Sequence, residues 1–166
     1  EVYYRGAWLR NDTDIEFQLA DILLPDGVLR VDKAMSVNPV EAHLGHYALP
    51  HLTNTIKEKT IKKHGYTAYV IENEKHQLAM VPLYGWKEVG FEHTSGLHPE
   101  SDECTVLNAK EIFTGEKIFV TLLLWNKAGM KVDNKRLFPV KDVLVSHDKK
   151  SVTVLLNDGT RKEVVW

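Results

Sequence analysis

Histidines are concentrated in one short segment, from Glu41 to His51, which holds His43, His46 and His51 out of eight in the whole chain. Imidazole is a common zinc ligand, and a zinc site needs three or four ligands around one ion. His43 and His46 are three residues apart, which would let them meet on one helical turn. No HExxH pattern or cysteine pair accompanies them. We therefore assign no metal ligand and keep a small metalloenzyme, ligated by these three histidines, as an alternative.

The same segment suits hydrogen bonding to a sugar, because carboxylate, imidazole and phenol groups donate or accept protons. Loops on a rigid β scaffold commonly carry such binding residues. We predict a loop that faces a substrate or a neighbouring domain, with these residues exposed: Glu41, His43, His46, Tyr47 and His51. A purely structural role, in which the imidazoles bind backbone groups or line an interface, remains open.

Tryptophan rings offer a second route to sugar binding, because aromatic faces pack on the CH groups of sugars. Trp8 and Trp86 are the candidates for sugar stacking, since each has Gly and a basic residue within two positions. Trp125 follows an apolar run and is expected in the core. A free-standing carbohydrate-binding module is therefore another alternative.

Other chemistry has little support in the sequence. Nucleophile and phosphate motifs such as G-x-S-x-G and the P-loop are absent, and no cofactor is expected. The polar segment from His93 to Glu103 lacks EF-hand spacing and is expected to be a solvated loop. Cys104 is the single cysteine and has acidic neighbours, which favours an inert thiol.

Charge and hydropathy exclude two classes of partner. The 21 basic and 23 acidic residues give a formal charge of −2, so nothing favours binding to nucleic acid. No apolar run is long enough for a membrane span, so no membrane partner is expected. No targeting segment is apparent in this part of the chain, and the localisation stays undetermined.

Alternation of apolar and polar residues dominates the chain and predicts many short strands. The run Ile118–Trp125 is apolar on both faces and predicts a central strand that is covered on both sides. Asn157-Asp158-Gly159 is a hairpin turn signal. Further strands are expected at 2–9, 15–20, 28–31, 55–62, 66–72, 77–83, 86–94, 143–146, 151–156 and 160–166.

Helical signals are limited to single turns that begin at Asn38-Pro39 and at Asn108. The sequence therefore predicts an all-β fold, an antiparallel β-sandwich with long loops and at most one or two short helical turns. Residues 1–166 are expected to form a single domain. Because the chain begins and ends inside expected strands, we interpret it as the C-terminal part of a longer protein.

The first third of the chain resembles a known bacterial module. A Trp precedes a strand, a Pro-x-Gly turn follows, and then come an Arg-Val strand and a Gly-aromatic-Ala-Leu stretch. These features lie at Trp8, Ile15–Leu19, Pro25–Gly27, Arg30-Val31 and Gly45–Leu49. In this order they are similar to the opening of the C-terminal β domain of the bacterial domain-of-unknown-function family 2264.

That resemblance implies a function for the parent protein. Members place this β domain after a helical (α/α) toroid similar to glucuronidase-like glycoside hydrolases. The resemblance implies an accessory, non-catalytic domain that braces the toroid. It further implies that the N-terminal toroid of the same chain is the partner, with the Glu41–His51 segment near the cleft and an oligosaccharide as ligand.

Overall fold

The computed structural model describes residues 2–10, 15–50, 57–72, 76–94, 104–127 and 134–166, with side chains described for 15–43, 57–72, 76–93, 105–126 and 135–166. The described part of the chain is almost entirely antiparallel sheet. Its elements are β1 (Val2–Arg10), β2 (Ile15–Leu24), β3 (Gly27–Pro50), β4 (Lys57–Lys63), β5 (Tyr66–Glu72), β6 (His76–Tyr84), β7 (Glu88–Thr94), β8 (Cys104–Lys127), α1 (Asn134–Leu137), β9 (Val140–Val145), β10 (Ser151–Leu156) and β11 (Arg161–Val165). The prediction of an all-β sandwich is confirmed.

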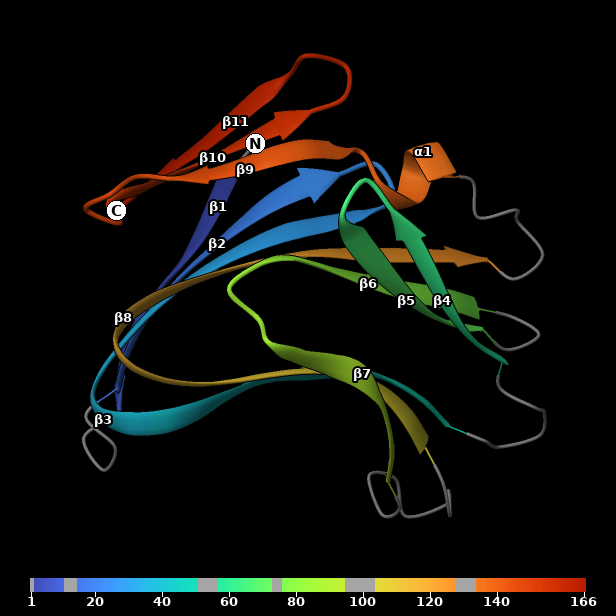
Figure 1. The fold of residues 1–166 in the computed structure, drawn as a ribbon, viewed down its shortest axis with the longest axis horizontal. Helices are drawn as coiled ribbons and strands as arrows, with labels where there is room; N and C mark the ends of the chain where they lie inside the picture. Colours follow the sequence, from blue (N-terminus) through green and yellow to red (C-terminus); the bar gives the residue numbers. More distant parts are fainter. Residues whose placement is uncertain (1, 11–14, 51–56, 73–75, 95–103, 128–133) are drawn as a thin grey trace.

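The strands form two sheets (Figure 1). The large sheet has eight strands in the order β1-β2-β3-β8-β6-β5-β4, and β7 also pairs with β8. The small sheet has the order β11-β10-β9, which confirms the C-terminal meander. Its two turns contain Lys149 and Gly159 with φ of 55° and 86°, values that tight turns require.

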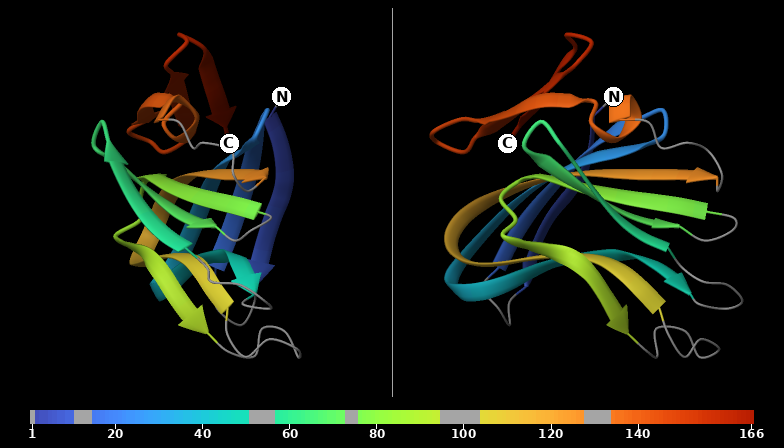
Figure 2. Two further views of the ribbon diagram at one scale, coloured as in Figure 1. Left: turned by 90° about the vertical axis from the view of Figure 1, so that its right-hand side faces the viewer. Right: turned by 45° about the vertical axis from the view of Figure 1, so that its right-hand side comes forward.

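Two 24-residue strands, β3 and β8, organise the large sheet. They pair with each other from Gly27↔Leu124 to Pro50↔Cys104 and bend together (Figure 2). On one side of the bend, β6 pairs with the C-terminal half of β8. On the other side, β7 pairs with the N-terminal half of β8. One sheet therefore supplies two layers, which we call the upper arm (β1, β2, β4, β5, β6 and residues 27–36 and 115–127) and the lower arm (β7 and residues 40–50 and 104–113).

A β-bulge produces the bend. Residues 37–39 of β3 lie opposite the single residue Thr114 of β8, between the pairs Ser36↔Gly115 and Val40↔Phe113. Such an insertion bends a strand and sharpens its twist. Pro39 has no N–H to donate and so suits an unpaired position, while Gly115 has a φ of 76° that other residues rarely adopt.

Both helical turns that the sequence predicted are wrong, because these residues belong to the two long strands. Asn38-Pro39 belongs to the bulge of β3, and Asn108 belongs to β8. Cross-strand pairing along the whole of β3 and β8 outweighs the local capping preference of these residues. The single described helix, α1, is a four-residue turn.

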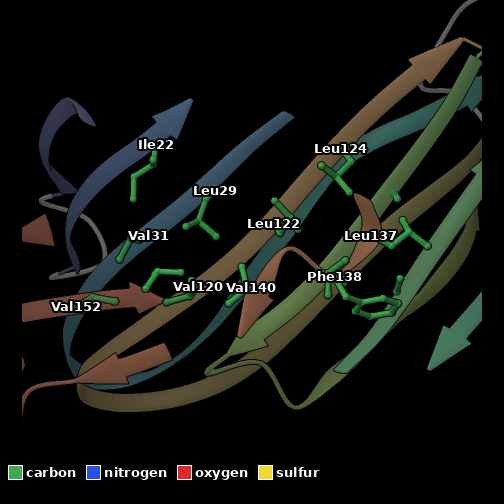
Figure 3. Packing of buried hydrophobic residues seen from close by; sticks show 14 of the residues in the cluster. Ile22, Leu29, Val31, Val120, Leu122, Leu124, Leu137, Phe138, Val140 and Val152 are labelled. Carbon is green, nitrogen blue, oxygen red and sulfur yellow. The ribbon is translucent and has the colours of Figure 1, made fainter. Parts of the chain in front are cut away.

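The first core lies between the upper arm and the small sheet. Ile22, Leu29 and Leu122 of the large sheet face Leu137 and Val140 across this layer (Figure 3). Val152, Val154 and Val164 of the small sheet belong to the same cluster, and all three are fully buried. Removal of this apolar area from water is the main force that attaches the small sheet to the large one.

The second core lies between the two arms. Leu107 and Ala109 of the lower arm pack against Ile71, Met80 and Leu123 of the upper arm. At the bend, Phe119 lies at the centre of a third cluster with Phe113, Ala34 and Ala42. Residues 118–124 of β8 are thus covered on both faces, as predicted for this run.

Burial in β8 ends after Leu124. Leu124 is 3% exposed, whereas Trp125 is 47% exposed. The expectation that Trp125 belongs to the core is therefore wrong, because it lies just past the covered segment.

Removal of Phe119 should destabilise the bend. Its ring is 1% exposed, and its centroid lies 4.1 Å from that of Trp86 and 5.7 Å from that of Phe113. We expect Phe119→Ala to lower the free energy of unfolding by about 3–5 kcal/mol, because large cavities in cores cost that much. Urea denaturation followed by tryptophan fluorescence measures the loss.

Ile112→Ala on the same strand is the matched control, because Ile112 is 63% exposed. It should change stability by less than about 0.5 kcal/mol. Equal losses in the two variants would contradict the placement of Phe119 at the centre of the bend.

Candidate functional site

The segment that sequence analysis selected is a strand of the lower arm. Residues 41–50 belong to β3, so the expected loop is wrong; pairing with β8 organises this backbone. Glu41 and His43 are exposed, and the Glu41 Oε1 is in contact with the His43 Nε2. His46 and Tyr47 lie in β3, but their side chains, like the whole of His51, lie outside the described residues.

A second bulge interrupts β3 at residues 45–46. These two residues lie opposite Asn108 alone, between the pairs Leu44↔Ala109 and Tyr47↔Leu107. Bulges often occur beside functional sites, where they redirect side chains. His46 therefore occupies a distinctive backbone position, directly opposite a polar residue of β8.

Polar side chains form a cross-strand row on the outer face of the lower arm. Lys110 of β8 lies in register with His43 on one side and with Glu88 of β7 on the other. Two residues further along, Asn108 pairs with Gly90. Residues two apart on a strand share a face, so Glu92 of β7 joins the same surface.

Glu92 and Lys110 form the central ion pair of this surface. The carboxylate Oε1 lies 2.5 Å from the Lys110 Nζ. Hydrogen bonds from Lys110 first, and then from the Asn108 side chain, hold the pKa of Glu92 below its usual value. The same bond to Glu92 raises the pKa of Lys110. Both groups are therefore charged at neutral pH, and the Glu92 carboxylate is an acceptor rather than a proton donor.

Two adjoining hollows lie over this surface. The first, of about 190 Å³, lies between β7 and β8 and is lined by Glu88, Val89, Gly90, Phe91, Glu92, Asn108 and Lys110. The second, of about 180 Å³, is lined by Glu41, Lys87, Glu88, Lys110, Glu111 and Ile112. Because they share Glu88 and Lys110, they form one continuous polar surface, which we call the polar groove.

Glu111 is the buried carboxylate of the polar groove. Its side chain is 2% exposed, and its Oε1 lies 3.0 Å from the Lys87 Nζ and 3.1 Å from the Lys117 Nζ. Burial alone raises the pKa of Glu111, but the hydrogen bonds from Lys87 and Lys117 bring it below its usual value. Glu111 is therefore ionised and fixes the position of Lys87 at the rim.

Trp86, one of the two tryptophans selected for sugar stacking, lies against the core of the bend. The Trp86 indole stacks on Phe119, and its Nε1 donates a hydrogen bond of 2.8 Å to the Thr121 Oγ1. One face of this ring is thus covered by the core of the bend. Trp8 pairs with Phe17 between β1 and β2, and its side chain lies outside the described residues.

Sequence analysis missed the central residues of the groove. Gly90, Asn108 and Lys110 carry no motif, and they come together only through the register of β7 with β8. Among the described residues, no three His, Cys, Asp or Glu side chains are grouped closely enough to hold a metal ion. In the same part of the chain, no helix is both long and apolar enough to cross a membrane.

Outside the polar groove, Asp32 is a buried polar residue of the upper arm that sequence analysis did not single out. It is 7% exposed, and its Oδ1 has no hydrogen-bond partner. Burial raises the pKa of Asp32 from 3.8 to about 7, although the Arg30 guanidinium opposes the shift; the Asp21 carboxylate adds to it. Ionised Asp32 therefore destabilises the fold.

Comparisons with known proteins identify the fold. No protein-family model matches the chain, and no curated protein sequence is similar to it. The whole chain superposes on 28% of a mutant of heparan sulfate lyase HepC from Pedobacter heparinus, with a TM-score of 0.55 and 12% identity. At this identity the likeness establishes a shared fold, which in that enzyme is part of a longer chain.

Two further solved structures are more distant. The non-mutant HepC from the same organism covers 98% of the chain at a TM-score of 0.49 and 10% identity. A putative kojibiose phosphorylase from the human microbiome covers 81% of it at 0.46 and 15% identity. The chain spans less than a third of the length of each of these proteins.

Asp32 should make stability depend on pH. Its folded-state pKa lies above the unfolded value, so stability falls as pH rises from 3.8 to about 7 and is constant above that. We expect Asp32→Asn to gain stability over the native chain by roughly 2–3 kcal/mol more at pH 8 than at pH 5. Urea denaturation at both pH values measures this.

Asp158→Asn is the control, because a hydrogen bond from the Thr160 backbone, chiefly, lowers the pKa of Asp158 and keeps it ionised from pH 5 to 8. Its effect on stability should be the same at both pH values. A pH-independent effect of Asp32→Asn would contradict the raised pKa of Asp32.

Proposed function

We propose that this chain is an accessory β-sandwich domain of a bacterial carbohydrate-active protein, a glucuronidase-like glycoside hydrolase of the domain-of-unknown-function family 2264. It braces an N-terminal helical toroid of the same chain, which performs the catalysis. One observation supports this role most directly. The whole chain, from end to end, matches 28% of an enzyme named for a polysaccharide.

The charge states of the polar groove favour an accessory role over a catalytic one. Glycoside hydrolysis needs a carboxylic acid whose raised pKa lets it protonate the leaving group. Glu92 and Glu111 have the opposite property, since lysines lower the pKa of each. Ionised carboxylates accept hydrogen bonds from hydroxyl groups, so this surface is suited to hold a sugar or a neighbouring domain.

A free-standing carbohydrate-binding module is the second candidate. The 47% exposed Trp125 favours it, because an exposed indole can stack on a sugar ring. The third candidate, a metalloenzyme using His43, His46 and His51, stays a prediction, because two of the three side chains lie outside the described residues.

Activity measurements on the full natural protein and on residues 1–166 test the accessory role. We expect the full protein to hydrolyse oligosaccharides and residues 1–166 alone to have no hydrolytic activity. Loss of one hydrogen bond near the cleft should raise KM about two- to tenfold in Glu41→Gln or His43→Ala, with kcat nearly unchanged. Steady-state kinetics on a panel of neutral and uronic-acid oligosaccharides gives both constants.

Glu163→Gln is the matched control, because Glu163 is an exposed carboxylate on β11, in the small sheet. It should leave both constants unchanged. Hydrolysis by residues 1–166 alone, or a full protein that contains no helical domain, would overturn the accessory role.

A further inference from the structure

We propose that the hollow between β7 and β8 binds one sugar unit that is neutral or carries an amino group, and that it rejects sulfated and uronic-acid sugars. This inference rests on the proposed carbohydrate function and adds the class of sugar held in this hollow, which is separate from the unit that the catalytic toroid would cleave. The hollow has a volume of about 190 Å³, below the roughly 300–1,000 Å³ of pockets for drug-sized ligands. It therefore suits a single unit of a saccharide chain.

Gly90 creates the space in this hollow. A Cβ atom added there would have no other atom within 4 Å, and the φ of Gly90 is not positive. The backbone thus imposes no need for glycine at this position. A glycine inside a strand marks a bulge, a tight bend or the close approach of a ligand or another backbone, and the pairing of β7 with β8 has no bulge at Gly90. Its missing side chain leaves the surface open directly across from Asn108, its partner in the register.

Asn108, which lines the hollow, carries a buried hydrogen-bond acceptor that has no partner. Its side chain lines the space, the residue is 6% exposed, and its Oδ1 has no partner. The Asn108 side chain donates toward the Glu92 carboxylate, which identifies the NH₂ group as the end of the amide nearer to Glu92. An unsatisfied buried acceptor costs about 1–3 kcal/mol. Because this oxygen is itself buried, a ligand hydroxyl or ammonium group would recover that cost after a rotation of the Asn108 side chain brings the oxygen into the hollow.

The charges around the hollow exclude anionic ligands. The carboxylates of Glu88 and Glu92 lie against one ammonium group, that of Lys110, which is already bound to Glu92. In the adjoining hollow, Lys87 is similarly bound to Glu111. A sulfate or carboxylate group has no proton to donate to Asn108 and would meet these acceptors with repulsion. Hydroxyl groups and ammonium groups match the same acceptors.

Calorimetric titration of residues 1–166 tests this selectivity. The probes are neutral gluco- and manno-oligosaccharides, glucosamine oligosaccharides, oligogalacturonate and heparin-derived oligosaccharides. We expect the neutral or the glucosamine probes to bind at least about tenfold more tightly than either acidic probe. We further expect Gly90→Val, which fills the hollow, to weaken that binding at least about tenfold while the melting temperature stays equal or rises, since valine favours strands.

Thr60→Val is the matched control, because it introduces the same side chain on the exposed strand β4. It should leave affinity unchanged. Unaltered binding by Gly90→Val would overturn the inference. Preferential binding of the acidic probes, for which the exposed Lys57, Lys59 and Lys62 of β4 are cationic candidates outside the groove, would overturn it while the carbohydrate function stands. Absence of binding to every probe would overturn it too, and activity of the full protein would still decide the accessory role.

Discussion

The pairing of β3 with β8 is the interaction on which the rest of the structure depends. It runs from Gly27↔Leu124 to Pro50↔Cys104 through a bulge at residues 37–39. Because both strands bend together, one sheet provides both arms, and the pairing interrupted at residues 37–39 resumes at Val40↔Phe113. The upper arm then buries its second face under the small sheet, which leaves residues 118–124 of β8 covered on both sides.

The polar groove is a consequence of this bend. The inner face of the lower arm packs against the upper arm, so its outer face remains open to solvent. On that face the register aligns β3, β8 and β7, and it places Lys110 between His43 and Glu88. Ion pairs hold Lys110 and Lys87, whereas the Asn108 Oδ1 has no partner. A rigid sheet thus presents a fixed set of acceptors, as binding of a hydroxyl-rich ligand requires.

Alternation predicted the strands whose two faces differ in polarity, such as Tyr66–Glu72 and the C-terminal meander. It failed for Glu41–Pro50, because bulges interrupt the alternation of that strand and its exposed residues resemble those of a loop. The residue types of the His-rich segment placed Glu41 and His43 among candidate binding residues, and both lie beside the groove or within it. Gly90 and Asn108 were not predictable, because they meet only through tertiary pairing of β7 with β8.

Amide NMR titration of residues 1–166 with a neutral oligosaccharide tests the central claim most directly, because it reports the position of the ligand residue by residue. The Gly90 amide and the side-chain amide of Asn108 give separate signals on the two sides of the hollow. If the polar groove binds sugar, both signals and those of neighbouring residues on β7 and β8 will shift in a saturable way. Shifts confined to the surroundings of Trp125, or to β4, would contradict the assignment of the site.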